Sequence, residues 1–340
     1  QITNDLIAED WIIEVGESES TGGRRPILLR FNPTAGYVLG LKLMEDRIVC
    51  AVTDLDNEVV EYIERFNTAR AFDAVSSAIV KIIRDAVRIS GIASQEVMGV
   101  GIGLAGVIDC QQGIVHYSPF FHWQEQPLAD HVAEQLAMPV YIENDVNTLT
   151  ITEQLYGDGL VVEDFVVVTV GRGVGLGMVL NHQLYHSEPG GAGELGHITV
   201  AVDGPVCGCG KRGCLEALAA DPAVVRYVED ALAAGAESAI DQPISIAHII
   251  AAADAGDTLA QEALAVSGRW LGVGLSTVVN MLRPSRIIIS GEGVAAGDHR
   301  LQPMIEAMRA NAFNGLLDDV TIIVKPTDDQ TWARGAASLV

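Results

Sequence analysis

One histidine and three cysteines of this 340-residue chain are spaced as ligands for a metal ion. Nine residues separate His197 from Cys207, and Cys209 and Cys214 follow closely. One imidazole and three thiolates form a complete tetrahedral set for Zn²⁺, and a closed set is typical of a structural rather than a catalytic zinc. The alternative is buried cysteines beside an unrelated histidine, but three thiols within eight residues seldom cluster for packing alone. The sequence therefore predicts a zinc site.

Composition and charge limit the class of protein. The chain has a formal net charge of -24, 49% hydrophobic residues and 35 glycines, as expected of a globular α/β protein with many turns. Such a charge repels nucleic acid, so DNA contact requires a local basic cluster or residues outside this chain. No apolar run approaches the roughly 20 residues of a membrane span. With Cys50 and Cys110 interpreted as free core thiols, we expect a cytoplasmic protein without a membrane partner.

Strand and helix patterns alternate along the chain and predict two α/β lobes. In the first lobe we expect strands at residues 37–43, 48–53, 59–66, 97–104 and 140–143, and helices at 74–90 and 127–136. In the second we expect strands at 165–170, 175–180, 183–185 and 286–290, and helices at 222–234, 245–255 and 258–282. Two lobes of similar plan imply a cleft between them, which is where such proteins usually bind a small ligand.

A different pattern precedes the lobes. Apolar spacing predicts a helix over residues 2–11, followed by short strands at 12–15 and 27–31. The loop between these strands contains Gly22, Gly23, Arg24 and Arg25. A winged helix ends in this order of elements: a helix, a strand, a basic loop and a second strand. A solvated linker turn explains the pair of arginines equally well. Because Gln1 is not an initiator Met and no capping residue precedes the helix, we expect an upstream portion to be absent from this chain.

Three motifs in combination resemble the ROK family, which groups sugar kinases with winged-helix repressors. The first motif runs from Glu194 through the metal cluster to Glu216, the second is Asn144-Asp145, and the third is a series of alternating glycines from residue 171 to 177. The resemblance covers almost the whole chain. It implies the α/β fold of the two-lobed actin-like ATPases (ribonuclease H-like) with a structural zinc site, preceded by the remnant of a winged helix-turn-helix.

The resemblance also implies the roles of individual residues. Zinc would be bound by His197, Cys207, Cys209 and Cys214. A sugar would be surrounded by Gly103, Asn144, Asp145, Glu194, His197 and Glu216. Carboxylates, an amide and an imidazole suit a pyranose because each sugar hydroxyl both donates and accepts hydrogen bonds. Bound zinc would hold some of these groups in place. In kinases of the family the residue matching Asp145 is the general base, although Asn-Asp alone is also an ordinary strand-end turn.

The first hairpin departs from the kinase pattern, Gly-x-Asp-x-Gly-Gly-Thr. Lys42 stands in place of the Asp, and Met44 and Glu45 replace the two glycines. Phosphoryl transfer depends on positioning and electrostatic stabilisation, and these substitutions work against both. We therefore predict that the chain is not an enzyme and that Asp145 is a vestigial base.

The second phosphate loop of the family is only partly retained. Its glycines are Gly171, Gly173 and Gly175, but Arg172 stands where the family usually has Thr. Arg172 could bind an anion or pair with Glu45. We interpret this loop as vestigial as well.

These departures favour a sugar-responsive transcriptional regulator, a ROK-type repressor. Its expected parts are the tail of a winged-helix DNA-binding domain at residues 1–33, an N-terminal lobe at 34–147 and a C-terminal lobe at 148–340 whose last helix can pack on the first lobe. The expected partners are a sugar effector and operator DNA, which would be bound through the N-terminal domain missing from this chain. The chain is also expected to form a homodimer or homotetramer.

One alternative is a ROK sugar kinase that phosphorylates a hexose or amino sugar with ATP. Another is a DNA-binding or scaffold protein with a dead sugar site, since Phe120 stands where the family commonly has Asn.

Overall fold

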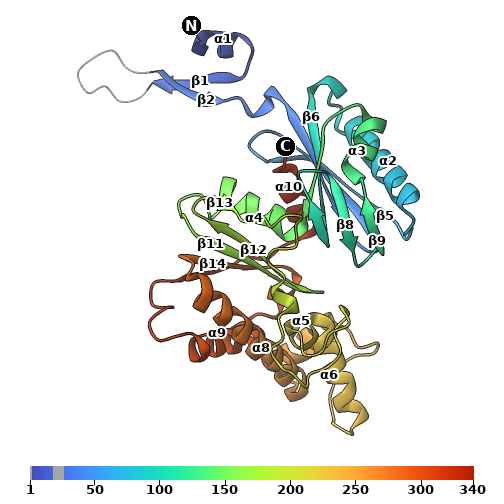
Figure 1. Cartoon of the computed structure of the whole chain (residues 1–340), viewed down its shortest axis with the longest axis vertical. Coiled ribbons are helices and arrows are strands. Elements are labelled where there is room, and N and C mark those ends of the chain that lie inside the picture. The colour runs from blue at the N-terminus through green and yellow to red at the C-terminus, as the bar shows by residue number, and fades with distance from the viewer. Residues whose placement is uncertain (1, 18–26) are drawn as a thin grey trace, which may run out of the picture. The chain divides into compact units, whose positions relative to one another are not determined.

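The computed structural model describes residues 2–17 and 27–340, which fall into two compact units (Figure 1). Unit 1 contains the chain up to Thr148 together with Asp329–Val340, and unit 2 contains Leu149–Asp328. The C-terminal helix α10 (Asp329–Ala337) therefore belongs to unit 1. Among the described residues, no helix has the length and apolar character needed to cross a membrane.

The N-terminal segment contains the predicted helix and two strands. They are α1 (Ile2–Ala8), β1 (Ile12–Glu17) and β2 (Ile27–Phe31), and the two strands pair antiparallel with a bulge between Glu14 and Gly16. The loop residues expected to form a wing, Gly22, Gly23, Arg24 and Arg25, lie outside the described residues.

Unit 1 is built on a five-stranded sheet of order β10-β6-β3-β4-β5. The strands are β3 (Tyr37–Leu43), β4 (Arg47–Thr53), β5 (Val59–Phe66), β6 (Val97–Leu104) and β10 (Val140–Asn144). The first three form an antiparallel meander, whereas β6 and β10 run parallel to β3. All five were predicted to within one residue at each end.

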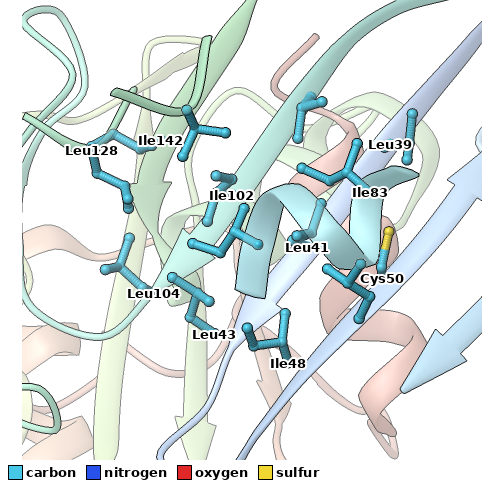
Figure 2. Close-up of a cluster of buried hydrophobic side chains, with 14 of the residues drawn as sticks. Leu39, Leu41, Leu43, Ile48, Cys50, Ile83, Ile102, Leu104, Leu128 and Ile142 are labelled. Atoms are coloured by element: carbon cyan, nitrogen blue, oxygen red, sulfur yellow. The ribbon is translucent and has the colours of Figure 1, made fainter. Parts of the chain in front are cut away.

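Helices cover both faces of this sheet, so its central strands β3 and β6 are apolar except at Lys42. On one face, Leu39, Leu41 and Leu43 of β3 point into a buried cluster completed by α2 (Phe72–Ser90) and α3 (Leu128–Leu136) (Figure 2). On the opposite face, α10 packs against β3, β4 and β6. Because successive residues of a strand face opposite sides of the sheet, Gly40 and the side chain of Lys42 are on the side of α10.

Two glycines allow α10 to lie directly on the strands. A Cβ at Gly40 would overlap the carbonyl oxygen of Ala333, and one at Gly101 would overlap that of Ala336. Ala333 and Ala336 are themselves small and fully buried. The close approach of helix and sheet backbones therefore depends on small residues on both sides.

Gly40→Ala is expected to destabilise unit 1 by about 1–3 kcal/mol or more, because the rigid backbone of α10 would have to move. Gly36→Ala is the matched control, since the nearest atoms that its methyl group would meet belong to the flexible side chain of Met98. Urea unfolding measures both. Equal losses of stability would contradict the packing argument.

A small three-stranded sheet completes unit 1; the sequence has a strand-like apolar stretch at its first strand, but no pattern indicated the other two. It consists of β7 (Val107–Asp109), β8 (Ile114–Ser118) and β9 (Trp123–Gln126). Cys110 directly follows β7 and is only partly buried, so the expectation of a core thiol at this position was wrong, whereas Cys50 in β4 is fully buried. Both thiols are free.

Unit 2 repeats the strand order of unit 1. Its sheet has the order β13-β12-β11-β14-β15, with an antiparallel meander of three strands followed by two parallel strands. The strands are β11 (Phe165–Val170), β12 (Val174–Leu180), β13 (Gln183–Leu184), β14 (Arg286–Ser290) and β15 (Thr321–Val324). The predicted repetition of one plan is confirmed, and β15 is an addition to it.

Six helices accompany the sheet of unit 2. They are α4 (Asp145–Tyr156), which begins at the end of unit 1, α5 (Leu215–Ala219), α6 (Asp221–Ala233), α7 (Ile246–Asp254), α8 (Thr258–Leu282) and α9 (Asp298–Asn311). The predicted helices correspond to α6, α7 and α8. The long helix α8 contributes Leu271, Leu275 and Val279 to the core beneath the sheet.

Candidate functional site

The four predicted metal ligands come together in unit 2. Their ligand atoms all lie within 4.8 Å of one another. His197 Nδ1 is 3.6 Å from Cys207 Sγ, and Cys209 Sγ is 3.7 Å from Cys214 Sγ. Ligand atoms about 2.0–2.3 Å from a tetrahedral zinc are themselves about 3.3–3.8 Å apart, so these separations suit a single ion. A His/Cys cluster able to hold a metal is confirmed, and zinc as its occupant stays a prediction.

A tight loop brings the cysteines together. Cys207 N donates to the carbonyl of Lys211 at 2.8 Å, and Gly210 adopts a φ of +89° within the turn between them. The ammonium of Lys211 donates to the carbonyl of His197 at 2.9 Å, which ties the loop to the segment that carries the histidine. Burial raises the pKa of the Cys214 thiol to about 12, so a bound cation is needed to hold it as a thiolate.

The imidazole of His197 faces the cluster with one nitrogen and an acid with the other. Nδ1 is directed at Cys207, while Nε2 lies 3.8 Å from Glu194 Oε2. A carboxylate on the far nitrogen of a metal-binding histidine fixes the orientation of the ring. The structure thus brings Glu194 close to His197. The predicted metal-binding role of His197 and the predicted sugar-binding role of the two residues both need this proximity.

Glu216, the other acid that flanks the cluster, contacts the glycine turn. It lies in the first turn of α5, and its Oε2 accepts a hydrogen bond from Val174 N at 3.3 Å. Gly171 N donates to the carbonyl of Gly173 at 3.1 Å, which closes the turn between β11 and β12. Gly175 follows in β12, opposite Thr169 of β11.

In unit 1, Asp145 forms an ion pair with Lys42. The two side chains are only 12% and 8% exposed, and the ammonium lies 4.3 Å from the centre of the Trp332 ring. Asp145 Oδ1 also accepts from Val146 N at 2.9 Å. The residue expected as a vestigial base is therefore held by Lys42, and no local sequence pattern indicates this pairing.

Asn144 caps helix α4. Its Oδ1 accepts from the backbone N–H groups of Val146 at 2.9 Å and Asn147 at 3.4 Å, and its Nδ2 donates to the carbonyl of Gly106 at 3.1 Å. This is the behaviour of a residue at a strand-to-helix junction. Gly103 lies nearby in β6, where a Cβ would come within 3.3 Å of Thr148 of α4. Contacts of Asn144 and Gly103 with a sugar stay predictions.

The altered turn between β3 and β4 has an ion pair of its own. Glu45 lies 3.6 Å from Arg70, whose guanidinium is 5.9 Å from the ring of Phe121. Phe121 belongs to the same loop as Phe120, which replaces the Asn expected near a sugar. Arg70 therefore links the turn between β3 and β4 to the loop that contains Phe120 and Phe121.

A sequence model of the ROK family matches residues 38–340 of this chain. The chain belongs to the ROK family. The xylose repressor of Caldicellulosiruptor bescii is 28% identical over 346 residues, which cover 100% of this chain and 86% of that protein. Within the ROK family this relative therefore aligns with the N-terminal segment as well as with both units.

Two solved ROK structures show the same fold. A transcriptional regulator described as a homolog of the Escherichia coli MLC protein superposes with a TM-score of 0.88 at 27% identity, covering 99% of this chain and 86% of that one. A glucokinase from Streptomyces griseus in complex with glucose and AMPPNP superposes with a TM-score of 0.76 at 29% identity, covering 90% of this chain and 99% of that one. The two-unit α/β fold is thus shared by ROK regulators and kinases, and function must be argued from the site.

Proposed function

We propose that this chain is the effector-binding part of a sugar-responsive transcriptional repressor of the ROK family, acting in the cytoplasm. The observation that carries the proposal is the buried pair of Lys42 and Asp145. A general base must take a proton from a hydroxyl group. In Asp145 both carboxylate oxygens already accept hydrogen bonds, Oδ2 from Lys42 Nζ and Oδ1 from Val146 N, so a sugar hydroxyl would have to compete with these donors for either oxygen. The repressor named among the relatives agrees with this interpretation.

The proposed sugar contacts are the predicted polar groups of the two units. Asn144, Asp145 and the backbone at Gly103 belong to unit 1, and Glu194, His197 and Glu216 belong to unit 2. Zinc bound by His197 and the three cysteines would fix the imidazole and the loop without taking part in any reaction. The 3.8 Å approach of His197 Nε2 to Glu194 Oε2 within unit 2 supports a shared role for these two residues.

The N-terminal segment is proposed to belong to the DNA-binding domain. Every residue of β2 is exposed, with Phe31 at 63% and Ile27 at 46%, and Val15 of β1 is 50% exposed. Such apolar side chains on a two-stranded sheet support packing against further residues of a winged helix-turn-helix. Gly22, Gly23, Arg24 and Arg25 would form its wing on operator DNA. A homodimer or homotetramer would present two or more such DNA-binding domains to the operator.

A thermal-shift screen of zinc-loaded protein against monosaccharides and disaccharides tests the proposal. A sugar at about 100 times its Kd adds about 2.7 kcal/mol of stability, which raises the Tm by several degrees. Glu194→Gln is expected to reduce that shift, whereas Glu229→Gln on the exposed surface of α6 makes the same charge change and should preserve it.

The same sugars, incubated with ATP and Mg²⁺, test the alternative of a ROK sugar kinase. We expect no phosphorylated sugar above the level of a protein-free control. Measurable transfer of phosphate would overturn the repressor proposal. The absence of any Tm shift across the panel would instead favour a DNA-binding or scaffold protein with a dead sugar site, for which Phe120 is the supporting residue.

A further inference from the structure

Carboxylates of the protein itself lie against the glycine turn that the family resemblance assigns to phosphate. A Cβ at Gly171 would overlap Glu292 Oε2, and a Cβ at Gly173 would lie 2.7 Å from Glu216 Oε2. Glycines at such a turn normally let a phosphate approach the backbone. In this chain the space beside both glycines is filled by negatively charged oxygens.

The segment that carries Glu292 is anchored on its N-terminal side. Gly291 adopts a φ of +93°, and a Cβ there would overlap the carbonyl oxygen of Val170 at the end of β11. Gly291 N also donates to Thr327 Oγ1 at 3.1 Å. The backbone before Glu292 is thus held directly against the strand that leads into the glycine turn.

A buried arginine anchors the other side. Arg300, which is 1% exposed, donates to the carbonyl of Gly293 at 3.0 Å and to Asp221 Oδ1 at 2.8 Å. Asp221 N in turn donates to the carbonyl of Gly171 at 2.8 Å. A continuous chain of hydrogen bonds therefore connects the Glu292 segment to the glycine turn, so the fold of unit 2 fixes the backbone from which the Glu292 side chain reaches the turn.

We propose that Glu292 determines specificity by occupying the anion position of the Gly171–Gly173 turn and excluding phosphate groups from it. The inference rests on the proposed function, because it explains how a sugar sensor built on a kinase fold ignores ATP and its products. An ionised carboxylate only accepts hydrogen bonds, as phosphate oxygens do, so the two cannot satisfy one another. Their like charges also repel at short range.

The test compares Glu292→Gln with the unaltered chain by calorimetry against pyrophosphate and ADP. The amide keeps the size of the side chain, removes its charge and offers a donor, so we expect each probe to bind at least about tenfold more tightly. The side chain of Glu292 is exposed, so the substitution leaves the core intact. Glu306→Gln on the exposed face of α9 is the matched control, since it makes the same change in net charge outside the turn.

Two outcomes would overturn the proposal: no gain of affinity in Glu292→Gln, or an equal gain in Glu306→Gln. The sugar screen on the same preparations distinguishes this failure from failure of the proposed function. If sugars raise the Tm but the probes do not bind Glu292→Gln, only the role of Glu292 is wrong. If the probes bind Glu292→Gln but no sugar binds any variant, the exclusion of anions stands and the sugar-sensor function fails.

Discussion

Lys42→Met is expected to destabilise unit 1 by about 3–5 kcal/mol, because it leaves the Asp145 carboxylate buried without its counter-ion. Methionine keeps most of the volume of the side chain, so the substitution creates little cavity. The loss of stability therefore measures the effect of the unpaired charge rather than that of a cavity. Urea unfolding, followed by the fluorescence of the tryptophans, gives the difference in free energy.

A double-mutant cycle separates the ion pair from the rest of the packing. Lys42→Met combined with Asp145→Asn should be more stable than Lys42→Met alone, since the double variant buries no unpaired charge. Arg47→Met supplies a matched control. Arg47 also pairs with α10, through Asp329 at 2.7 Å, but both side chains are 25% exposed and water screens them, so the expected loss is about 1 kcal/mol or less. Strictly additive losses in the cycle would contradict the proposed pair.

Cys214→Ser is expected to abolish binding of zinc at one ion per chain and to lower the melting temperature sharply. Removing a ligand should weaken affinity by more than the 10–100-fold that is typical of outer-shell changes. The fully buried position then loses its thiolate and holds a hydroxyl among apolar neighbours. Metal analysis of the purified protein and a thermal melt measure the two effects.

Cys110→Ser is the control for this prediction, since Cys110 is a free thiol outside the cluster. It should retain a full complement of zinc. Retention of zinc by Cys214→Ser would show that the cluster is not the metal site. Loss of zinc from Cys209→Ser with unchanged sugar binding would show that the metal does not support the effector site.

The metal cluster was predictable because its ligands are close in sequence and their chemistry is specific. The strands around it were predictable because β-branched runs such as that of β11 have a strong local pattern. Lys42 and Asp145 are 103 residues apart, and neither their distance nor their burial has a local signature. Departure from the kinase motif identified Lys42 as unusual, but only the folded unit shows what it binds.

Helix α4 was missed for a related reason. Two of its buried residues, Thr148 and Thr150, lie on opposite sides of the helix; both are 0% exposed, and they lie against Gly103 and Gly177 respectively. Threonine is polar and β-branched, so the apolar period of 3.6 residues that announces a helix is interrupted there. The three short strands β7 to β9 likewise contain too few residues to establish an alternation.

The return of α10 to unit 1 determines the order in which the polypeptide can complete its folding during synthesis. Unit 2 is one continuous stretch and has all its residues as soon as Asp328 has emerged from the ribosome. The sheet of unit 1 is synthesised earlier, yet the face around Gly40 and Gly101 stays uncovered until α10 has been synthesised. The packing of unit 1 therefore depends on a segment that is synthesised only after the whole of unit 2.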